Sequence, residues 1–296
     1  MNTQLSRLLP LASLVSALFL SGLPTAQANT LAENLAVMEK QSPIDINAHD
    51  TKFQQLSPLQ FNLSSDTTLS VINNGSPDET KTAARANVLP GAGSVTVDGD
   101  TYKLAQFHFH TPAENLENGH RFPMEMHLVF SDANNNILVV GRWIQGVDGP
   151  NAPTTALDPI FNDLPKNTTQ THVFNHFDLN ALLPANTESF RYDGSLTTPP
   201  FTEGVKWVHL AQPLQMSSAE INNFSSLFPP NPLSPLGGDA RGIQDLNGRV
   251  VLTDVPGFAS AVPEPGTYAM LLAGLGLIGF TARRRLVNPG LMTSVA

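Results

Sequence analysis

The stretch from Gln106 to Val129, which reads QFHFHTPAENLENGHRFPMEMHLV, constrains the fold of this chain more than any other. His108 and His110 stand two apart in a run of β-forming residues, and His127 lies in a second such run further along. Side chains two apart on a strand share a face. His108 and His110 are therefore expected to point the same way.

The residues around the histidines fit two neighbouring strands. Phe107 and Phe109 alternate with the first two histidines and are expected to point into the core. Asn118-Gly119 is a strong turn signal between the two runs. It lets the chain fold back, so that His127 reaches the other two imidazoles from an adjacent strand.

Three imidazoles that face one point predict a metal site. Three neutral histidines with a fourth position open form the ligand set of a catalytic zinc centre rather than a closed structural one. The same two-residue offset places Gln106 on the face of His108, and Glu125 on the face of His127. An amide and a carboxylate there can orient the two imidazoles.

Two other interpretations of the stretch stay open. Histidines on a strand are often ordinary core residues that a neighbouring group satisfies. In addition, His108, His110 and Glu114 have the His-x-His-x-x-x-Glu spacing of cupins, in which all three residues bind iron or manganese.

The first 28 residues have the organisation of a secretory signal peptide. Arg7 supplies the positive charge, residues 8–20 the apolar core, and Ala26-Gln27-Ala28 the small residues of a cleavage site. We expect this segment to be absent from the folded domain.

The C-terminal end has a second targeting segment, residues 263–285, followed by a tail of residues 286–296. Pro263-Glu264-Pro265 precedes an apolar run and the cluster Arg283-Arg284-Arg285. This order resembles the PEP-CTERM sorting tail of exported proteins in Gram-negative bacteria. It implies export to the periplasm, the outer-membrane surface or the medium, with transient anchoring and sorting at a membrane or into exopolysaccharide. A short membrane anchor is the alternative.

Charge and cysteine content narrow the partners of the mature chain. Without the two end segments, 12 basic and 24 acidic residues remain, a net charge of −12. Such an acidic surface argues against nucleic acid as a partner. The chain has no cysteine, so a single core of some 230 residues must hold the domain together without disulfides. The sequence predicts no oligomeric state.

Between its ends the chain has a β-rich pattern with few helical signals. Asp98-Gly99 is expected to close a hairpin, and Ser217 and Glu220 have the spacing of a helix capping box. The predicted fold is mainly β (α+β): one domain around a large, mostly antiparallel central sheet with short peripheral helices. The predicted strands are residues 59–63, 69–72, 94–97, 102–110, 122–130, 137–144, 205–211 and 249–252, and the predicted helices are residues 155–164 and 217–227.

Several motifs in this order resemble those of the α-class carbonic anhydrases. They are QSPIDI at residues 41–46, the histidine stretch, SLTTPP at residues 195–200, Asp239-Ala240-Arg241 and LNGR at residues 246–249. The resemblance covers residues 41–252 and implies a catalytic domain of residues 41–257. A lead-in of residues 29–40 would precede this domain, and a linker of residues 258–262 would follow it.

The resemblance implies a role for each residue of the site. Zinc would be the cofactor, and carbon dioxide and bicarbonate the small-molecule substrates. Thr197 and Glu114 would be the catalytic pair that orients a zinc-bound hydroxide, because an ionised Glu114 only accepts hydrogen bonds and makes the Thr197 hydroxyl donate to it. The other implied roles are zinc ligands (His108, His110, His127), orienting partners (Gln106, Glu125) and substrate contacts (Thr198, Leu196, Val129, Val139, Trp207).

The implied activity is the reversible, zinc-dependent hydration of carbon dioxide to bicarbonate and a proton. Two alternatives are a non-catalytic zinc-binding surface module of the same fold and a cupin-type metal oxygenase.

The chain departs from the family pattern at three places. Ser76 stands where the family has its proton-shuttle histidine, and serine carries no proton near neutral pH, so we expect turnover to depend on buffer. Phe201 stands where many exported members have a cysteine, and its packing is expected to replace the disulfide. Residues 29–40 lack the tryptophan-bearing segment usual in the family.

Overall fold

The computed structural model describes residues 40–74, 84–228 and 238–259, and in the tail residue 270 and residues 272–275 and 277–278. The predicted signal peptide and Ser76 lie outside these residues.

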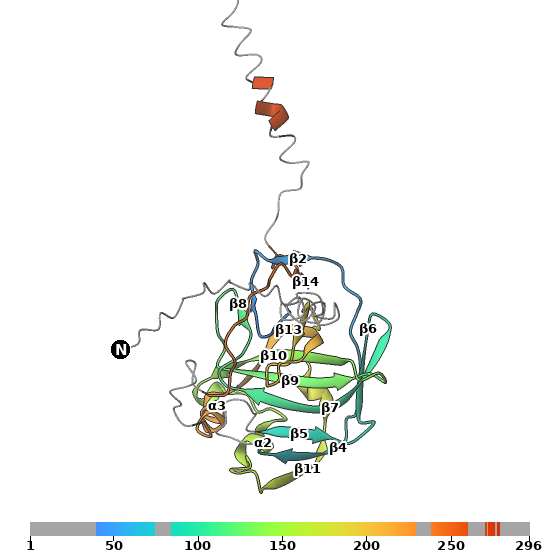
Figure 1. The fold of residues 1–296 in the computed structure, drawn as a ribbon. Helices are drawn as coiled ribbons and strands as arrows, with labels where there is room; N and C mark the ends of the chain where they lie inside the picture. The colour runs from blue at the N-terminus through green and yellow to red at the C-terminus, as the bar shows by residue number, and fades with distance from the viewer. Residues whose placement is uncertain are drawn as a thin grey trace, which may run out of the picture. The chain divides into compact units, whose positions relative to one another are not determined.

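A twelve-stranded sheet runs through the domain (Figure 1). All its pairs are antiparallel except β10 with β13 and β14 with β2. The prediction of a large, mostly antiparallel sheet is therefore confirmed. In their order across the sheet the strands are β11 (Thr171–Phe177), β4 (Thr67–Ile72), β5 (Arg85–Val88), β7 (Asp100–His110), β9 (Met124–Ser131), β10 (Ile137–Val147), β13 (Glu203–Ser217), β12 (Ser189–Ser195), β14 (Val251–Thr253) and β2 (Thr51–Phe53); β6 (Gly93–Val97) pairs with β7 and with β3 (Gln60–Leu63).

Each predicted strand has a counterpart in the structure, and both predicted turns form. Asp98 and Gly99 have φ angles of 53° and 90° and join β6 to β7 as a two-residue hairpin. Asn118 and Gly119, with φ angles of 48° and 75°, turn the chain between β8 (Leu116–Glu117) and β9. β8 pairs with β1 (Asp45–Ile46) in a separate two-stranded parallel sheet.

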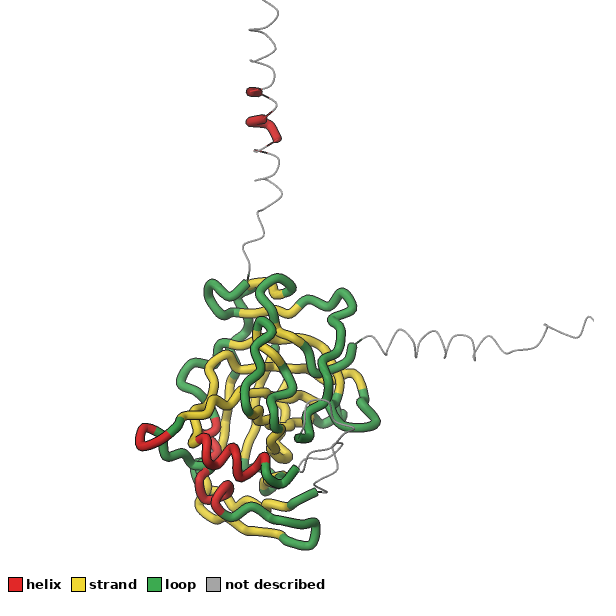
Figure 2. The backbone as a smooth tube through the Cα atoms, turned by 90° about the vertical axis from the view of Figure 1, so that its left-hand side faces the viewer, coloured by secondary structure: helices red, strands yellow, loops and turns green. Residues whose placement is uncertain are grey.

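One face of the large sheet packs on the main hydrophobic core. Alternate residues of β7 and β9 point into this core, among them Phe107 and Phe109, as their alternation with the histidines predicted. The Phe109 ring contacts Phe161 at 4.9 Å and Phe224 at 6.1 Å between centroids. Phe161 belongs to α2 (Asp158–Asn162) and Phe224 to α3 (Ser218–Ser225), and Figure 2 shows these helices near one end of the domain. The 3₁₀ helices are Gly149–Asn151 and Leu179–Leu182.

The start of α3 confirms the predicted capping box. The Ser217 hydroxyl accepts a hydrogen bond from the Ala219 N–H at 3.2 Å, and the Glu220 carboxyl accepts one from the Ser217 backbone. These side chains satisfy N–H groups that the first helical turn leaves unpaired. The other predicted helix, residues 155–164, is wrong in extent, because only Asp158–Asn162 is helical.

The opposite face of the sheet carries a second apolar cluster that includes Trp143, Phe190 and Trp207. Buried histidines and carboxylates interrupt this cluster, whereas the main core is almost wholly apolar. This face therefore holds the candidate site.

In the tail, the described residues are helical and their side chains are exposed. Among the residues that the structure describes, no helix is both long enough and apolar enough to span a bilayer.

Candidate metal centre

The strand register sets two histidines of the cluster, a glycine and His209 side by side across the sheet. His108 on β7 is opposite His127 on β9, and His127 is opposite Gly141 on β10. Gly141 is in turn opposite His209 on β13. Directly opposed residues share a face of a sheet, so these side chains form one transverse row.

His108, His110 and His127 meet at one point, as the sequence predicted. Their ring centroids lie 4.8 to 5.3 Å apart, and one ligand nitrogen from each lies within 4.8 Å of the others. His110 and His127 are buried, and His108 is partly exposed. The cluster can therefore hold one cation that is reached from the His108 side.

Gln106 orients His108. Its Oε1 lies 2.8 Å from His108 Nδ1, and an amide oxygen can only accept a hydrogen bond. His108 Nδ1 therefore carries the proton, which leaves the Nε2 lone pair for a cation. Burial lowers the pKa of His108 well below its usual value, with further lowering from the charges of His110, His127 and Arg85. His108 is thus held neutral, as a metal ligand must be.

Glu125 does the same for His127. Its Oε1 lies 2.9 Å from His127 Nε2 and 3.1 Å from His209 Nε2. Burial alone would raise the pKa of Glu125, but its hydrogen bonds and charge interactions with the two histidines hold the pKa well below the usual value. The carboxylate is therefore an acceptor for both imidazoles, and His127 Nδ1 is left to face the cluster.

Asn115 completes this arrangement, and sequence reasoning did not find it. Its backbone N–H and side-chain amide donate to Glu125 at 2.8 and 2.7 Å. Its own Oδ1 accepts from the Ile44 N–H at 3.0 Å and from the Tyr192 hydroxyl at 3.0 Å. Asn115 thus fixes the carboxylate and ties it to two distant segments, the residue before β1 and strand β12. Only its position next to Glu114 could have drawn attention to it.

His209 lies in the core beside the site. It is fully buried, and its ring centroid lies 3.8 Å from that of Trp143 with the two ring planes at 41°. With its bond to Glu125, it is a structural neighbour of the site rather than a member of the metal-binding cluster.

The third histidine, His110, has a partner that the sequence did not reveal. The Asp239 carboxylate approaches with Oδ2 at 3.2 Å from His110 Nδ1, while Oδ1 accepts from the Thr111 N–H at 2.9 Å. Burial lowers the pKa of His110, but Glu114 and Asp239 outweigh it and raise the pKa to about 9. These carboxylates therefore attract positive charge to the site.

Gly238 makes the approach of Asp239 feasible. Its φ is +61°, and a Cβ at this position would lie 1.7 Å from the Thr111 carbonyl oxygen. Only glycine fits such a contact between two backbone segments.

Glu114 lies beside the cluster rather than at the surface. Its Oε2 is 3.5 Å from His110 Nε2 and 3.9 Å from His127 Nδ1, and its Oε1 accepts from the Arg241 N–H at 2.9 Å. Burial raises the pKa of Glu114 to about 7, although His110, the Arg241 N–H and a hydrogen bond from Thr197 act to lower it. The structure thus brings Thr197 and Glu114 together from positions far apart in the sequence.

The loop that carries Thr197 follows β12 and is braced through Phe201. The Arg241 guanidinium lies over the Phe201 ring at 3.7 Å, and Gln41 Nε2 donates to the Phe201 carbonyl at 3.2 Å. Thr197 is buried, whereas Thr198 and Leu196 are partly exposed. A cation–π contact thus holds the loop in this cysteine-free chain.

The predicted apolar wall forms a second row, directly beside the histidine row. Gln106 is opposite Val129, Val129 opposite Val139, and Val139 opposite Trp207. The Trp207 ring meets the His127 ring edge-on at 5.0 Å, and Leu196 packs on the same cluster. An apolar surface therefore borders the histidines.

The unpaired polar atoms of the site fit a metal ion. Four buried polar atoms of the site form no hydrogen bond to a described residue: His110 Nδ1, His110 Nε2, Glu114 Oε2 and Asp239 Oδ2. Unpaired polar groups are costly inside a protein unless a ligand satisfies them. Three imidazoles are a donor set that suits zinc.

The remaining histidines in the described part of the chain lie elsewhere. His172 contacts Asp163, and His176 contacts Asp66, each as a pair without a third ligand. His49 and His120 are exposed, as expected for solvated side chains.

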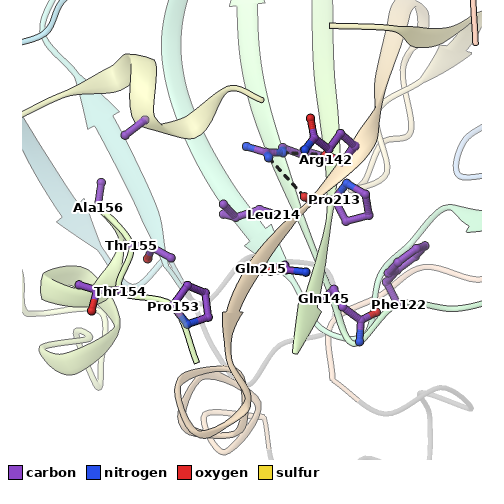
Figure 3. A pocket seen from close by; sticks show the side chains of 12 residues that line it. Phe122, Arg142, Gln145, Pro153, Thr154, Thr155, Ala156, Pro213, Leu214 and Gln215 are labelled. Atoms are coloured by element: carbon purple, nitrogen blue, oxygen red, sulfur yellow. Dashed lines mark hydrogen bonds between the residues drawn. The ribbon is translucent and has the colours of Figure 1, made fainter. Parts of the chain in front are cut away.

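A cavity of about 620 Å³ lies away from the histidine cluster, between the ends of β10 and β13 and residues 153–156 (Figure 3). Arg142 is the charged group of its lining. Its guanidinium already donates to the carbonyls of Leu182, Gln212 and Pro213. Because the guanidinium donors of Arg142 are engaged in this way, the cavity offers a ligand no free charged group.

Comparisons with known proteins agree with this geometry. The family model of eukaryotic-type carbonic anhydrases matches residues 29–255, and the model of the PEP-CTERM protein-sorting motif matches residues 261–285. A carbonic anhydrase of Klebsiella pneumoniae is 38% identical over 213 residues, which cover 72% of this chain and 79% of the relative.

Solved structures show the same relationship. The α-carbonic anhydrase of Thermovibrio ammonificans in complex with the inhibitor sulfanilamide is 34% identical, with a TM-score of 0.62 over 72% of this chain and 87% of that one. The α-carbonic anhydrase of Photobacterium profundum is 32% identical, with a TM-score of 0.61 over 77% and 95% of the two chains.

The chain belongs to the eukaryotic-type (α) carbonic anhydrase family and ends in a PEP-CTERM sorting motif. The family and the sorting motif that the sequence motifs predicted are thus confirmed. The sorting motif marks an exported protein of Gram-negative bacteria.

Proposed function

We propose that this protein is a zinc enzyme that reversibly hydrates carbon dioxide to bicarbonate and a proton. The single observation that carries the proposal is the convergence of three imidazoles, each with its second nitrogen within 3.2 Å of a side-chain oxygen. Such acceptors fix the tautomer and the orientation of a metal-binding histidine. His108, His110 and His127 would hold the ion through Nε2, Nε2 and Nδ1.

Zinc in this site would supply an activated water, because zinc in carbonic anhydrases is known to lower the pKa of its bound water to about 7. The chain's own residues would then direct the nucleophile. When Glu114 is ionised, its carboxylate accepts a hydrogen bond from the Thr197 hydroxyl, so Thr197 has only its lone pairs left to offer. Thr197 would therefore accept a hydrogen bond from the nucleophile, whose lone pair would then face the substrate.

The apolar row beside the histidines suits an uncharged substrate. Carbon dioxide carries no charge and accepts hydrogen bonds poorly, so Val129, Val139 and Trp207 would hold it without a competing polar group. Leu196 and Thr198, at the partly exposed end of the loop, would complete the pocket. A charged product would bind this surface less well and would leave.

Removal of the Thr197 hydroxyl tests this proposal. We expect Thr197→Val to lower the rate of carbon dioxide hydration about 100-fold, the scale of losing one positioned hydrogen-bonding group at the reacting atoms, with zinc stoichiometry unchanged. Thr202→Val, at an exposed position of the same loop, is the matched control and should retain the wild-type rate. Equal rates in both variants would contradict the proposed role of Thr197.

The alternative functions receive less support. The family match leaves the cupin-type oxygenase without support. A non-catalytic surface module of this fold would have no need of the Thr197 and Glu114 pair beside an intact histidine cluster.

We also propose that residues 1–28 direct export and are removed, that residues 41–257 form the catalytic domain, and that the tail sorts the protein at the cell envelope. Buffer-limited proton release, which the serine at position 76 suggests, stays a prediction.

A further inference from the structure

The histidine row has one more member, a cation that no step of the proposed mechanism uses. Arg85 on β5 is directly opposite His108 on β7. Its neighbours Ala86 and Val88 are buried in the main core, so Arg85 points to the other face of the sheet, the face of the histidines. Arg85, His108 and His127 thus follow one another on three adjacent strands, about 5 Å apart from strand to strand.

Arg85 lacks the partners that the other described arginines have. Its Nε is buried and has no hydrogen-bond partner, although part of the side chain is exposed. The described part of the chain supplies no carboxylate that forms an ion pair with it. Each of the other described arginines donates to at least one backbone carbonyl: Arg121 to Ala113, Arg142 to Leu182, Arg191 to Ser57, Arg241 to Ser42 and Arg249 to Asp193.

An unpaired guanidinium beside a cation site is unfavourable by itself. Two positive charges on neighbouring strands repel each other, and a buried donor without an acceptor costs free energy. An anion between them would remove both penalties. The guanidinium is a planar fork of donors that matches a planar oxyanion with two oxygens.

We propose that Arg85 binds bicarbonate, the anionic partner in the reaction, at the edge of the histidine cluster. This inference rests on the proposed function, because that reaction is what brings a planar oxyanion to this site. Arg85 would hold the anion on the β5 side, opposite the apolar row that receives carbon dioxide. The two faces of the pocket would then separate the charged reactant from the uncharged one.

The test is the dissociation constant of bicarbonate, measured on the metal-loaded protein with Co²⁺ in place of Zn²⁺, so that the visible spectrum reports on the bound ligand. We expect Arg85→Gln to raise this constant about three- to tenfold, between the effect of an exposed ion pair and that of a buried charged hydrogen bond. Arg85→Lys keeps the charge but loses the fork, so its constant should rise by less.

Lys103→Gln is the matched control. It removes one positive charge from an exposed position at the other end of β7, paired with Ser131, and should leave the constant unchanged. Equal constants in wild type and Arg85→Gln, or equal shifts in Arg85→Gln and Lys103→Gln, would overturn the role of Arg85. A wild type that takes up no metal would instead contradict the proposed function itself.

Discussion

Gly141 faces His209 across the parallel pair of β10 and β13, and the imidazole occupies the space that a side chain at Gly141 would need. A Cβ there would lie 2.5 Å from His209 Cδ2 and 3.3 Å from Glu125 Oε1. The glycine thus lets His209 reach the carboxylate that orients His127. Gly141, which has no side chain, therefore contributes to the position of His127 in the site.

Gly141→Ala should therefore loosen the site. The added methyl group must displace His209 or bend β10, and overpacking of this kind costs about 1 to 3 kcal/mol of folding free energy. Denaturant unfolding and a zinc-competition titration should show both lower stability and weaker zinc binding. Gly242→Ala is the control, since a Cβ at that exposed position meets nothing within 4 Å. If Gly242→Ala proved equally harmful, the contact with His209 would not be the cause.

Asp239→Asn replaces one carboxylate oxygen by an amide NH2 and should weaken zinc binding about 10- to 100-fold, the usual effect of losing a group that orients a ligand. The carboxylate has one acceptor for the Thr111 N–H and a second that faces His110 Nδ1. An amide has only one acceptor, so either Thr111 or His110 meets an N–H group. In the second case His110 must carry its proton on Nε2, where it blocks the metal.

A competition titration with a chelator measures this effect. The exposed Asp245→Asn, which removes the same charge outside the site, is the control and should bind zinc as the wild type does. Wild-type affinity in Asp239→Asn would contradict an orienting role for the carboxylate.

Phe201 should stabilise the loop that carries Thr197 through its aromatic ring. The contact with Arg241 is expected to contribute about 1 to 2 kcal/mol to stability. Phe201 has a φ of 59°, a conformation that asparagine accepts more readily than most residues. Phe201→Asn removes the ring without adding backbone strain, so it should still lose stability and hydration activity, although less stability than Phe201→Ala. Full stability of Phe201→Asn in denaturant unfolding would show that the ring does not brace the loop.

Glu220 should make stability fall with rising pH. Burial and the neighbouring Asp158 carboxylate raise the pKa of Glu220 in the folded protein, while the Ser217 N–H lowers it. The unfolded chain then loses this proton at a lower pH than the folded one. Stability falls as pH rises from about 4, the ordinary pKa of glutamate, through the raised folded value.

Glu220→Gln removes this titration and keeps the cap, because glutamine can also serve in a capping box. Unfolding measured between pH 4 and pH 7 should show the variant gaining on wild type as pH rises. A constant difference across this range would contradict the raised pKa.

Sequence reasoning predicted the strands and site residues whose positions depend on local patterns. His108, His110 and His127 could be placed on one face from strand periodicity, and Asp98-Gly99 could be placed in a hairpin from turn chemistry. Strands β1, β2, β5, β8, β11 and β12 escaped prediction. Strands β1, β2, β5 and β8 have only two to four residues, too few to show a period, and β11 is mostly polar or exposed. The place of β11 is set by pairing with β4, which lies far away in the chain.

The site residues that sequence reasoning missed share one property. Asn115 and Asp239 act through hydrogen bonds to residues distant in the sequence, such as Tyr192 and Thr111. No local pattern marks an asparagine or an aspartate for such a role. The position of Arg85 beside His108 likewise depends on the pairing of β5 with β7, which no local pattern predicts.

The central claim is that three histidines hold a zinc ion on which carbon dioxide hydration depends. Stopped-flow hydration by the metal-stripped protein, titrated with Zn²⁺, tests it most directly. We predict that activity rises in proportion to added zinc and stops rising at about one ion per chain, as expected for a single site with three protein ligands, and that His127→Ala neither binds zinc tightly nor gains activity. Full hydration by the metal-stripped wild type, or undiminished hydration by His127→Ala, would contradict the claim.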